Sequence, residues 1–142
     1  MALDDQIRGL LQATHTIAVV GLSDKSWRPS YDVAAYLQSA GYSIVPINPN
    51  VKQVLGLTAY PDLITAARER SIEIVDVFRK PEFVPEIVEQ ALAIRAAAVW
   101  LQLGVVHREA ARRAHEAGLI VVMDRCIKVE HQRWRESEER HT

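Results

Sequence analysis

Residues Thr16 to Ser30 read TIAVVGLSDKSWRPS, and this stretch decides the fold. It begins with an apolar, β-branched run that stops at Gly21, and a helical pattern then begins at Pro29-Ser30 and is ended by Gly41. Because the apolar run has no period of two, we expect a strand that is buried on both faces, as in a parallel sheet. The stretch therefore predicts the first strand-loop-helix unit of an α/β domain.

The same unit recurs along the rest of the chain. Apolar runs predict strands at 16–20, 43–47, 72–78, 97–101 and 119–123, and helical patterns cover 3–13, 30–40, 61–70, 85–95, 107–117 and 128–139. This alternation predicts one Rossmann-like domain over residues 1–142, with a core at about 14–130 and a charged C-terminal helix. A doubly wound parallel sheet of five strands can have the order 3-2-1-4-5 or the flavodoxin-like order 2-1-3-4-5. In both orders a ligand binds outside the carboxyl ends of the strands.

Composition excludes several classes of protein. The 142 residues are 49% hydrophobic and have a formal net charge of -1, which argues against a disordered chain and against a nucleic-acid binder. There is no membrane-spanning run, and a single cysteine fits a reducing cytoplasm. The five histidines lack metal-ligand spacing and there is no G-x-S-x-G elbow, so we identify no catalytic and no metal-binding residue. We expect most of these histidines to lie at the surface or to cap helices.

The loop after the first predicted strand has the composition of an anion site. It offers the hydroxyls of Ser23 and Ser30 and the cations Lys25 and Arg28, but its single glycine, Gly21, does not make a G-x-G-x-x-G or Walker motif. The helix that begins here adds free N–H groups and the positive end of a dipole. The alternative is an ordinary solvated loop with a helix cap.

The end of the second predicted strand argues against NAD. A nicotinamide-binding domain commonly has an acid here, whereas this chain has Pro46, Asn48, Pro49 and, shortly after, Lys52. A nearby lysine suits a nucleotide with an extra ribose phosphate, such as coenzyme A (CoA) or NADP. The alternative is that the asparagines only end the strand with turn chemistry.

Two further strand ends contain candidate residues. Val77 to Lys80, which includes Phe78 and Arg79, ends the third predicted strand with an aromatic ring and two cations. Within that strand we expect Asp76 to have a backbone or hydroxyl partner. Cys126 follows the fifth predicted strand, where it is either a reactive thiol beside cations or a small packing residue.

Taken together, the segments VVGLSDKSWRPS, GYSIVPINPN, VDVFRK, VWLQLGV and DRC resemble one family. They are similar to the small stand-alone CoA-binding proteins, whose domain is similar to the N-terminal domain of the succinyl-CoA synthetase α subunit. The resemblance runs from about Thr14 to about Glu130 and implies a Rossmann-like fold with the order 3-2-1-4-5. It implies that CoA phosphates lie at Gly21, Ser23, Lys25, Arg28 and Ser30, the adenosine and its 3′-phosphate at Pro46 to Lys52, and the nucleotide flank at Val77 to Lys80, with Gln102 bordering the site.

The resemblance implies binding of CoA or an acyl-CoA without ligase chemistry, because the phosphohistidine of the synthetase lies in a domain that we do not find in this sequence. Two other functions stay open. One is an NADP-dependent oxidoreductase, and the other is a regulatory domain with a vestigial cleft. In the second, Trp134 docks a protein partner or a second copy, although packing of Trp134 back onto the domain is favoured. A redox variant of CoA binding has Cys126 forming a mixed disulfide with the CoA thiol.

Overall fold

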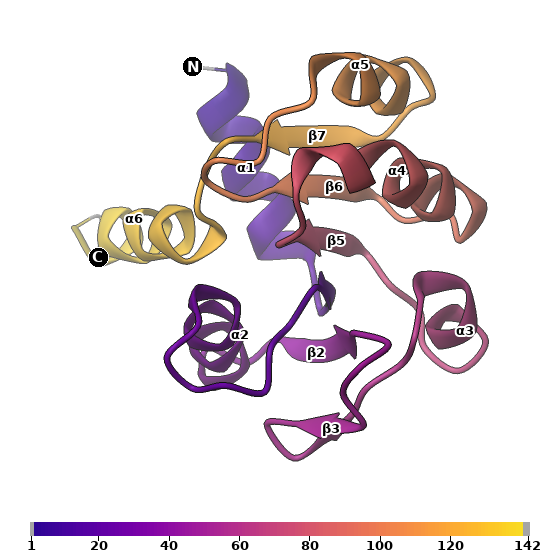
Figure 1. Ribbon diagram of the computed structural model, residues 1–142. Coiled ribbons are helices and arrows are strands. Elements are labelled where there is room, and N and C mark those ends of the chain that lie inside the picture. Colours follow the sequence, from indigo (N-terminus) through magenta and orange to yellow (C-terminus); the bar gives the residue numbers. More distant parts are fainter. Residues whose placement is uncertain (1, 141–142) are drawn as a thin grey trace.

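The computed structural model describes residues 2–140, in which a parallel sheet is enclosed by two layers of helices (Figure 1). All neighbouring strands of this sheet pair in parallel. The strand order is β2-β1-β5-β6-β7. The strands are β1 (Thr16–Val20), β2 (Ser43–Ile47), β5 (Ile74–Val77), β6 (Ala98–Leu101) and β7 (Ile120–Met123).

A rudimentary strand extends the sheet beyond β2. Tyr60 forms an isolated parallel bridge with Ile47; its N–H donates to the carbonyl of Pro46 and its carbonyl accepts from Asn48, both at 2.9 Å. If the Tyr60 segment is counted as the third strand along the chain, β5, β6 and β7 become the fourth, fifth and sixth strands. The sheet then has the Rossmann-like order 3-2-1-4-5, with β7 added as the sixth strand. The five full strands alone read 2-1-3-4-5. The predicted Rossmann-like parallel fold is confirmed.

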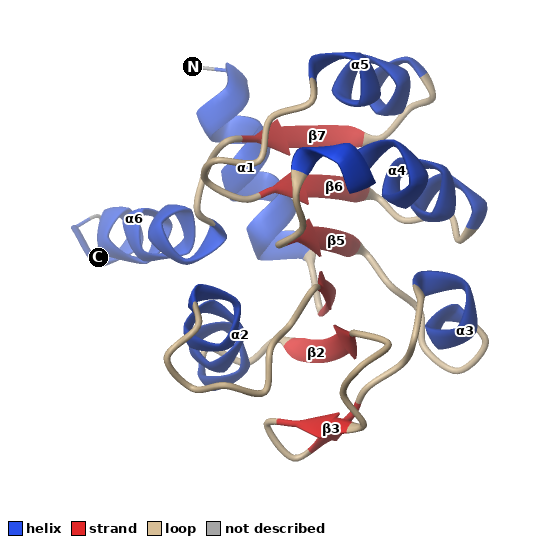
Figure 2. Ribbon diagram, viewed as in Figure 1, coloured by secondary structure: helices blue, strands red, loops and turns tan. Residues whose placement is uncertain are grey.

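The helices divide evenly between the two faces of the sheet (Figure 2). One face is covered by α1 (Ala2–Ala13), α2 (Pro29–Ser39) and α6 (Ile127–Arg140), and the other by α3 (Leu63–Ala67), α4 (Val84–Ala93) and α5 (Arg108–Glu116). Burial of both faces explains why the strands are continuous apolar runs. No helix within residues 2–140 is long and apolar enough to cross a membrane.

Two elements were not predicted from the sequence. A two-stranded hairpin, β3 (Gln53–Val54) and β4 (Leu57–Thr58), lies beyond β2 (Figure 1), and a short 3₁₀ helix, η1 (Pro81–Phe83), precedes α4. The hairpin turns through Leu55 and Gly56, both with positive φ (55° and 73°). Such a tight turn matches the twist of the flanking strands.

Asp76 lies in the middle of β5 and is completely buried. Its register neighbours are Val19 on β1 and Trp100 on β6, both apolar or aromatic. Neither carboxyl oxygen has a hydrogen-bond partner among the described residues, which corrects the expectation of a backbone or hydroxyl partner. Burial raises the pKa of this carboxyl well above its usual range.

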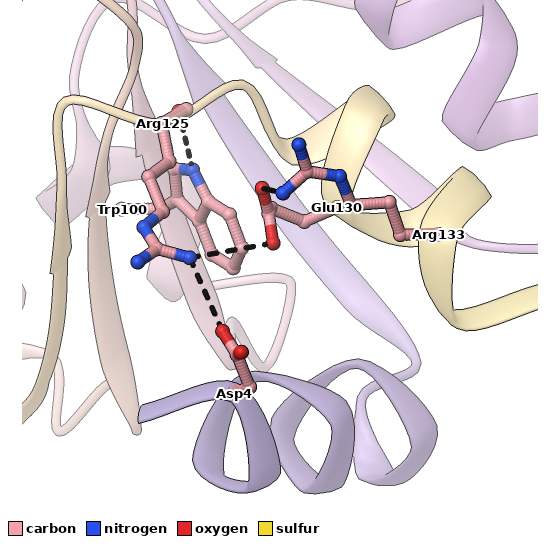
Figure 3. A network of polar contacts seen from close by, with 5 residues as sticks. All are labelled: Asp4, Trp100, Arg125, Glu130 and Arg133. Carbon is pink, nitrogen blue, oxygen red and sulfur yellow. Dashed lines mark hydrogen bonds and ion pairs between the residues drawn. The ribbon is translucent and has the colours of Figure 1, made fainter. Parts of the chain in front are cut away.

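A polar network fixes the segment between β7 and α6 (Figure 3). The indole N–H of Trp100 donates to the carbonyl of Arg125 at 2.9 Å. The Arg125 guanidinium contacts Asp4 of α1 at 3.4 Å and Glu130 of α6 at 3.5 Å, and Glu130 also pairs with Arg133 at 3.3 Å. The start of α6 is therefore tied to both β6 and α1.

Candidate functional site

The carboxyl edge of the sheet contains a cavity of about 680 Å³, at the point where the loops after β1, β2 and β5 meet. We call it the loop cavity. Its position is the one predicted for a ligand in a doubly wound sheet. Its lining residues are Gly21, Ser23, Asp24, Lys25, Arg28, Pro29, Ser30, Asn48, Asn50, Val51 and Phe78.

Hydroxyl groups hold the β1–α2 loop in shape. The N–H of Ser23 donates to Oγ of Ser30, and the N–H of Lys25 donates to Oγ of Ser23, both at 3.0 Å. The N–H of Arg28 donates to the carbonyl of Lys25 at 3.0 Å and closes a turn. Both serine oxygens act as acceptors in these bonds. The turn places the two cations at its ends, on the wall of the cavity.

Gly21 allows the β1 loop to approach the end of β5 closely. Its φ is +87°, and its N–H donates to the carbonyl of Ile47 at 2.9 Å. A Cβ at this position would lie 2.7 Å from the carbonyl oxygen of Phe78 and 3.0 Å from Cδ of Arg79. Only glycine fits this position without a shift of the neighbouring backbone.

Asn48 joins the β2 loop to the β1 loop. Its Nδ2 donates to the carbonyl of Leu22 and its Oδ1 accepts from the N–H of Asn50, both at 2.9 Å. The turn chemistry considered for this asparagine is therefore present, and the residue lines the loop cavity as well. Pro46 is buried within β2, and Lys52 is exposed beside the hairpin, outside the cavity lining.

Two more cavities adjoin the loop cavity along the same edge. The β6 cavity, of about 530 Å³, shares Pro29 and Phe78 with it. The α3–α4 cavity, of about 270 Å³, lies on the other side of the sheet. The β6 cavity is lined by Pro29, Val33, Phe78, Arg79, Lys80, Pro81, Gln102, Leu103, Gly104, Val105 and Cys126. The α3–α4 cavity is lined by Val20, Ile47, Pro49, Pro61, Asp62, Arg79, Phe83, Glu86, Ile87 and Gln90.

The end of β5 lies between these cavities. Arg79 lines both the β6 cavity and the α3–α4 cavity. Its guanidinium stacks over the ring of Phe83, 4.1 Å from the ring centroid. Lys80 is exposed on the β6 cavity, whereas Val77 is completely buried inside the strand. Of the candidates predicted here, Phe78 to Lys80 reach a cavity.

An ion pair neutralises the acid in the first turn of α2. Asp32 accepts from Nζ of Lys128 on α6 at 2.9 Å. A carboxylate in the first turn of a helix opposes the binding of an anion there. Because Lys128 is its partner, its opposition to an anion there is reduced.

Gln102 and Cys126 both lie on the β6 cavity. Gln102 is only 4% exposed, and its Oε1 accepts from the N–H of Ile127 at 3.1 Å, where α6 begins. Cys126 is half-buried. The mixed disulfide suggested for this thiol stays a prediction.

The histidines have structural roles in several places. Nδ1 of His107 accepts from the N–H of Ala110 at 3.0 Å and caps α5, as expected of a capping histidine. His131 does not fit that expectation, because it is buried and its Nδ1 lies 2.6 Å from the hydroxyl of Tyr36. Trp134 is half-buried and packs edge-on against His131, so it packs back onto the domain. No group of three potential metal ligands occurs within residues 2–140.

Comparison with known proteins identifies the family to which residues 15–132 belong. The CoA binding domain family matches residues 15–132, which contain the loop cavity and both of its neighbours. The chain belongs to this family. The sequence had indicated the same family from the loops that follow its strands.

Relatives of this CoA-binding domain include proteins of similar length. The Bacillus subtilis protein YneT is 42% identical over 126 residues, which cover 89% of this chain and 92% of YneT. A solved structure of a hypothetical protein from Pyrococcus horikoshii has a TM-score of 0.88 at 42% identity and covers 92% of this chain and 91% of its own. An ADP-forming acetate–CoA ligase of Archaeoglobus fulgidus is 30% identical over 77 residues, which are 53% of this chain and 11% of the ligase. The resemblance to small stand-alone CoA-binding proteins is thereby confirmed.

Proposed function

We propose that the protein binds CoA or an acyl-CoA through the 3′-phospho-ADP portion of the ligand, in the loop cavity. The observation that carries this proposal is the closed turn from Lys25 to Arg28. It holds two cations on the wall of a cavity that lies at the carboxyl edge of a CoA-binding domain.

Three kinds of donor favour a pyrophosphate in this cavity. The side chains of Lys25 and Arg28 supply positive charge, and the Ser23 hydroxyl supplies a hydrogen-bond donor. The third kind is the start of α2, which no side chain caps. Pro29 has no N–H and the N–H of Tyr31 donates to the carbonyl of Arg28, so the N–H of Ser30 and the positive end of the helix dipole serve an anion there. Charge-assisted bonds to phosphate are about twice as strong as neutral ones.

The adenosine and its 3′-phosphate are proposed to lie toward the β2 loop. Asn48, Asn50 and Val51 line that side of the cavity, and the next residue, Lys52, is exposed. A lysine there has a long, mobile stem that reaches a phosphate on the ribose. The same lysine would also tolerate NADP, so both nucleotides are included in the test below.

The proposal does not extend to ligase chemistry. The loop, β6 and α3–α4 cavities include no histidine in their lining that would become phosphorylated. A reducing cytoplasm is the proposed location, in view of the single cysteine. The proposed partner is the nucleotide ligand, and a homodimer stays a prediction.

Calorimetric titration of the ligand-free protein with CoA, dephospho-CoA, NADP and NAD at one salt concentration tests the proposal. We expect micromolar binding of CoA and about 10- to 100-fold weaker binding of dephospho-CoA, because a charge-assisted hydrogen bond contributes about 1.5–3 kcal/mol. Arg28→Ala should weaken both CoA and dephospho-CoA. Lys52→Ala should instead remove the difference between these two ligands.

A matched control is Arg112→Ala, which removes an exposed arginine of α5 on the opposite side of the molecule from α2. This variant should titrate like the unmodified protein. Absence of CoA binding, or equal affinity for CoA and NAD, would overturn the proposal. Tighter binding of NADP than of CoA would favour the oxidoreductase alternative.

A further inference from the structure

The β6 cavity is lined by a glutamine whose amide nitrogen has no hydrogen-bond partner among the described residues. Gln102 lines this cavity and is 4% exposed. Its Oε1 accepts from the N–H of Ile127, and this bond fixes the orientation of the amide because only the oxygen can accept. The amide nitrogen Nε2 then has two hydrogens and no hydrogen-bond acceptor within residues 2–140. Among the described residues only the Asp76 carboxyl oxygens are buried without a partner, so Nε2 of Gln102 is open to the cavity. An unpaired donor on the wall of a cavity favours a ligand that brings an acceptor.

The remaining wall of the cavity indicates what else the ligand contains. Most of it is apolar, and its lining includes no carboxylate. Leu103 forms part of this wall and is 71% exposed, so its side chain is accessible to a ligand. The apolar lining side chains are Pro29, Val33, Phe78, Pro81, Leu103 and Val105. Arg79 and Lys80 are the charged residues of the lining. The part of an occupant that contacts the apolar side chains is therefore apolar and has a hydrogen-bond acceptor for Gln102.

We propose that the β6 cavity binds the acyl end of a short-chain acyl-CoA, with Nε2 of Gln102 donating to the thioester carbonyl. This inference rests on the proposed function, because it takes the nucleotide to lie in the loop cavity. The two cavities share Pro29 and Phe78, so a ligand can pass from one to the other along the carboxyl edge.

A thioester fits this site better than the other groups of the same ligand. The free thiol of CoA is only a weak acceptor for an amide N–H. A pantetheine amide has a carbonyl, but it also brings an N–H that requires an acceptor, and the Gln102 oxygen is already bonded to Ile127. A thioester supplies a carbonyl without an N–H, and its alkyl group matches the apolar wall.

The variant Gln102→Glu isolates the donor. It keeps an oxygen for the N–H of Ile127 and replaces the free NH₂ by an acceptor, with almost no change in volume. We expect the unmodified protein to bind acetyl-CoA and butanoyl-CoA about tenfold more tightly than CoA, and Gln102→Glu to abolish this preference. Affinity for CoA and for 3′-phospho-ADP should change little.

A second variant keeps the test informative if Gln102→Glu fails to fold, which a thermal melt would show. Leu103→Asp places a charge on the exposed wall of the cavity, and it should weaken acetyl-CoA binding at least several-fold more than CoA binding. Arg112→Ala should preserve the preference.

Equal affinities of the unmodified protein for CoA and the acyl-CoAs would overturn the inference. A loss in Gln102→Glu that is the same for CoA and acetyl-CoA would overturn it too, because the donor would then serve another part of the ligand. In both cases, retained binding of CoA with a requirement for its 3′-phosphate leaves the proposed function intact. Failure to bind CoA or 3′-phospho-ADP at all would overturn both.

Discussion

At the scale of single residues, Asp76 makes stability depend on pH in an unusual direction. Burial raises the pKa of this carboxyl well above its ordinary value of about 3.9. The folded protein therefore keeps a proton that the unfolded chain has already released. The contribution of this group to the free energy of unfolding is therefore fully present below about pH 4. As the pH rises from there toward the raised pKa, the free energy of unfolding falls by about 1.4 kcal/mol per pH unit.

Asp76→Asn should remove this slope, because a neutral amide of the same shape does not titrate. Urea unfolding at several pH values between 4 and 8 measures the pH dependence of the free energy of unfolding. The variant should become increasingly more stable than the unmodified protein as the pH rises. Asp5→Asn is the control, since Asp5 is exposed on α1. Parallel pH profiles for Asp76→Asn and the unmodified protein would show that the carboxyl does not titrate as described.

Gln102 and Gly21 show how far single residues could be interpreted from the sequence. The sequence places both at strand ends, and the family resemblance associates both with CoA. The sequence does not show that Gly21 is needed for the close approach of the Phe78 carbonyl. Nor does it show that Gln102 accepts from the N–H of Ile127, because each contact joins segments that are far apart in the chain. Such contacts depend on which strands are neighbours, and the strand count left that open.

At the scale of elements, α6 is held to α2 by an aromatic cluster around a buried histidine. The ring of His131 meets Tyr36, Tyr42 and Trp134 edge-on, with centroids 5.4, 5.5 and 5.2 Å away. Burial, followed by the charge of Arg135, lowers the pKa of His131 below 6.5. The unfolded chain binds a proton here before the folded protein does. The contribution of His131 to the free energy of unfolding is therefore fully present above about pH 6.5, and it is lost as the pH falls through the lowered pKa.

His131→Phe should keep the ring contacts and remove the titration. At pH 7.5 it should lower the free energy of unfolding by about 0.5–1.5 kcal/mol, through loss of the bond to Tyr36, and between pH 6.5 and 5 it should lose less stability than the unmodified protein. Chemical unfolding at these pH values provides the measurement, and His115→Gln on the exposed part of α5 is the control. An equal loss in His131→Phe and the unmodified protein would contradict the prediction.

The elements themselves follow from local patterns, with one instructive exception. Long apolar runs and proline or glycine boundaries predicted the main strands and helices. The β3–β4 hairpin was not predicted because each of its strands has two residues, too few to show a period. Its turn also has Leu55 at positive φ, and leucine gives no sequence signal for that conformation. This hairpin also fixes the backbone of Lys52, whose carbonyl accepts from the N–H of Ala59, and the sequence alone did not predict that contact.

At the scale of the whole molecule, the proposed ligand would connect segments that are distant in sequence. The loop cavity and the β6 cavity together use the segments after β1, β2, β5, β6 and β7. These segments converge only because all five strands are parallel and end at one edge of the sheet. A ligand along this edge therefore stabilises the tertiary arrangement, whereas a ligand on one helix would act locally.

Hydrogen–deuterium exchange with saturating CoA should accordingly show protection in three separate segments, 21–30, 48–52 and 78–81. Acetyl-CoA should extend the protection to 102–105 and to the segment around Cys126, because its acyl end would lie in the β6 cavity. Dephospho-CoA at the same fractional saturation should protect 48–52 least, since it lacks the phosphate proposed to meet Lys52.

Peptides from the groove between α4 and α5, which contains Glu89 and Arg113, are the internal control and should not change. Protection confined to that groove would contradict a ligand at the carboxyl edge. Protection of 21–30 without 102–105 under acetyl-CoA would keep the nucleotide at the loop cavity and remove the acyl group from the β6 cavity.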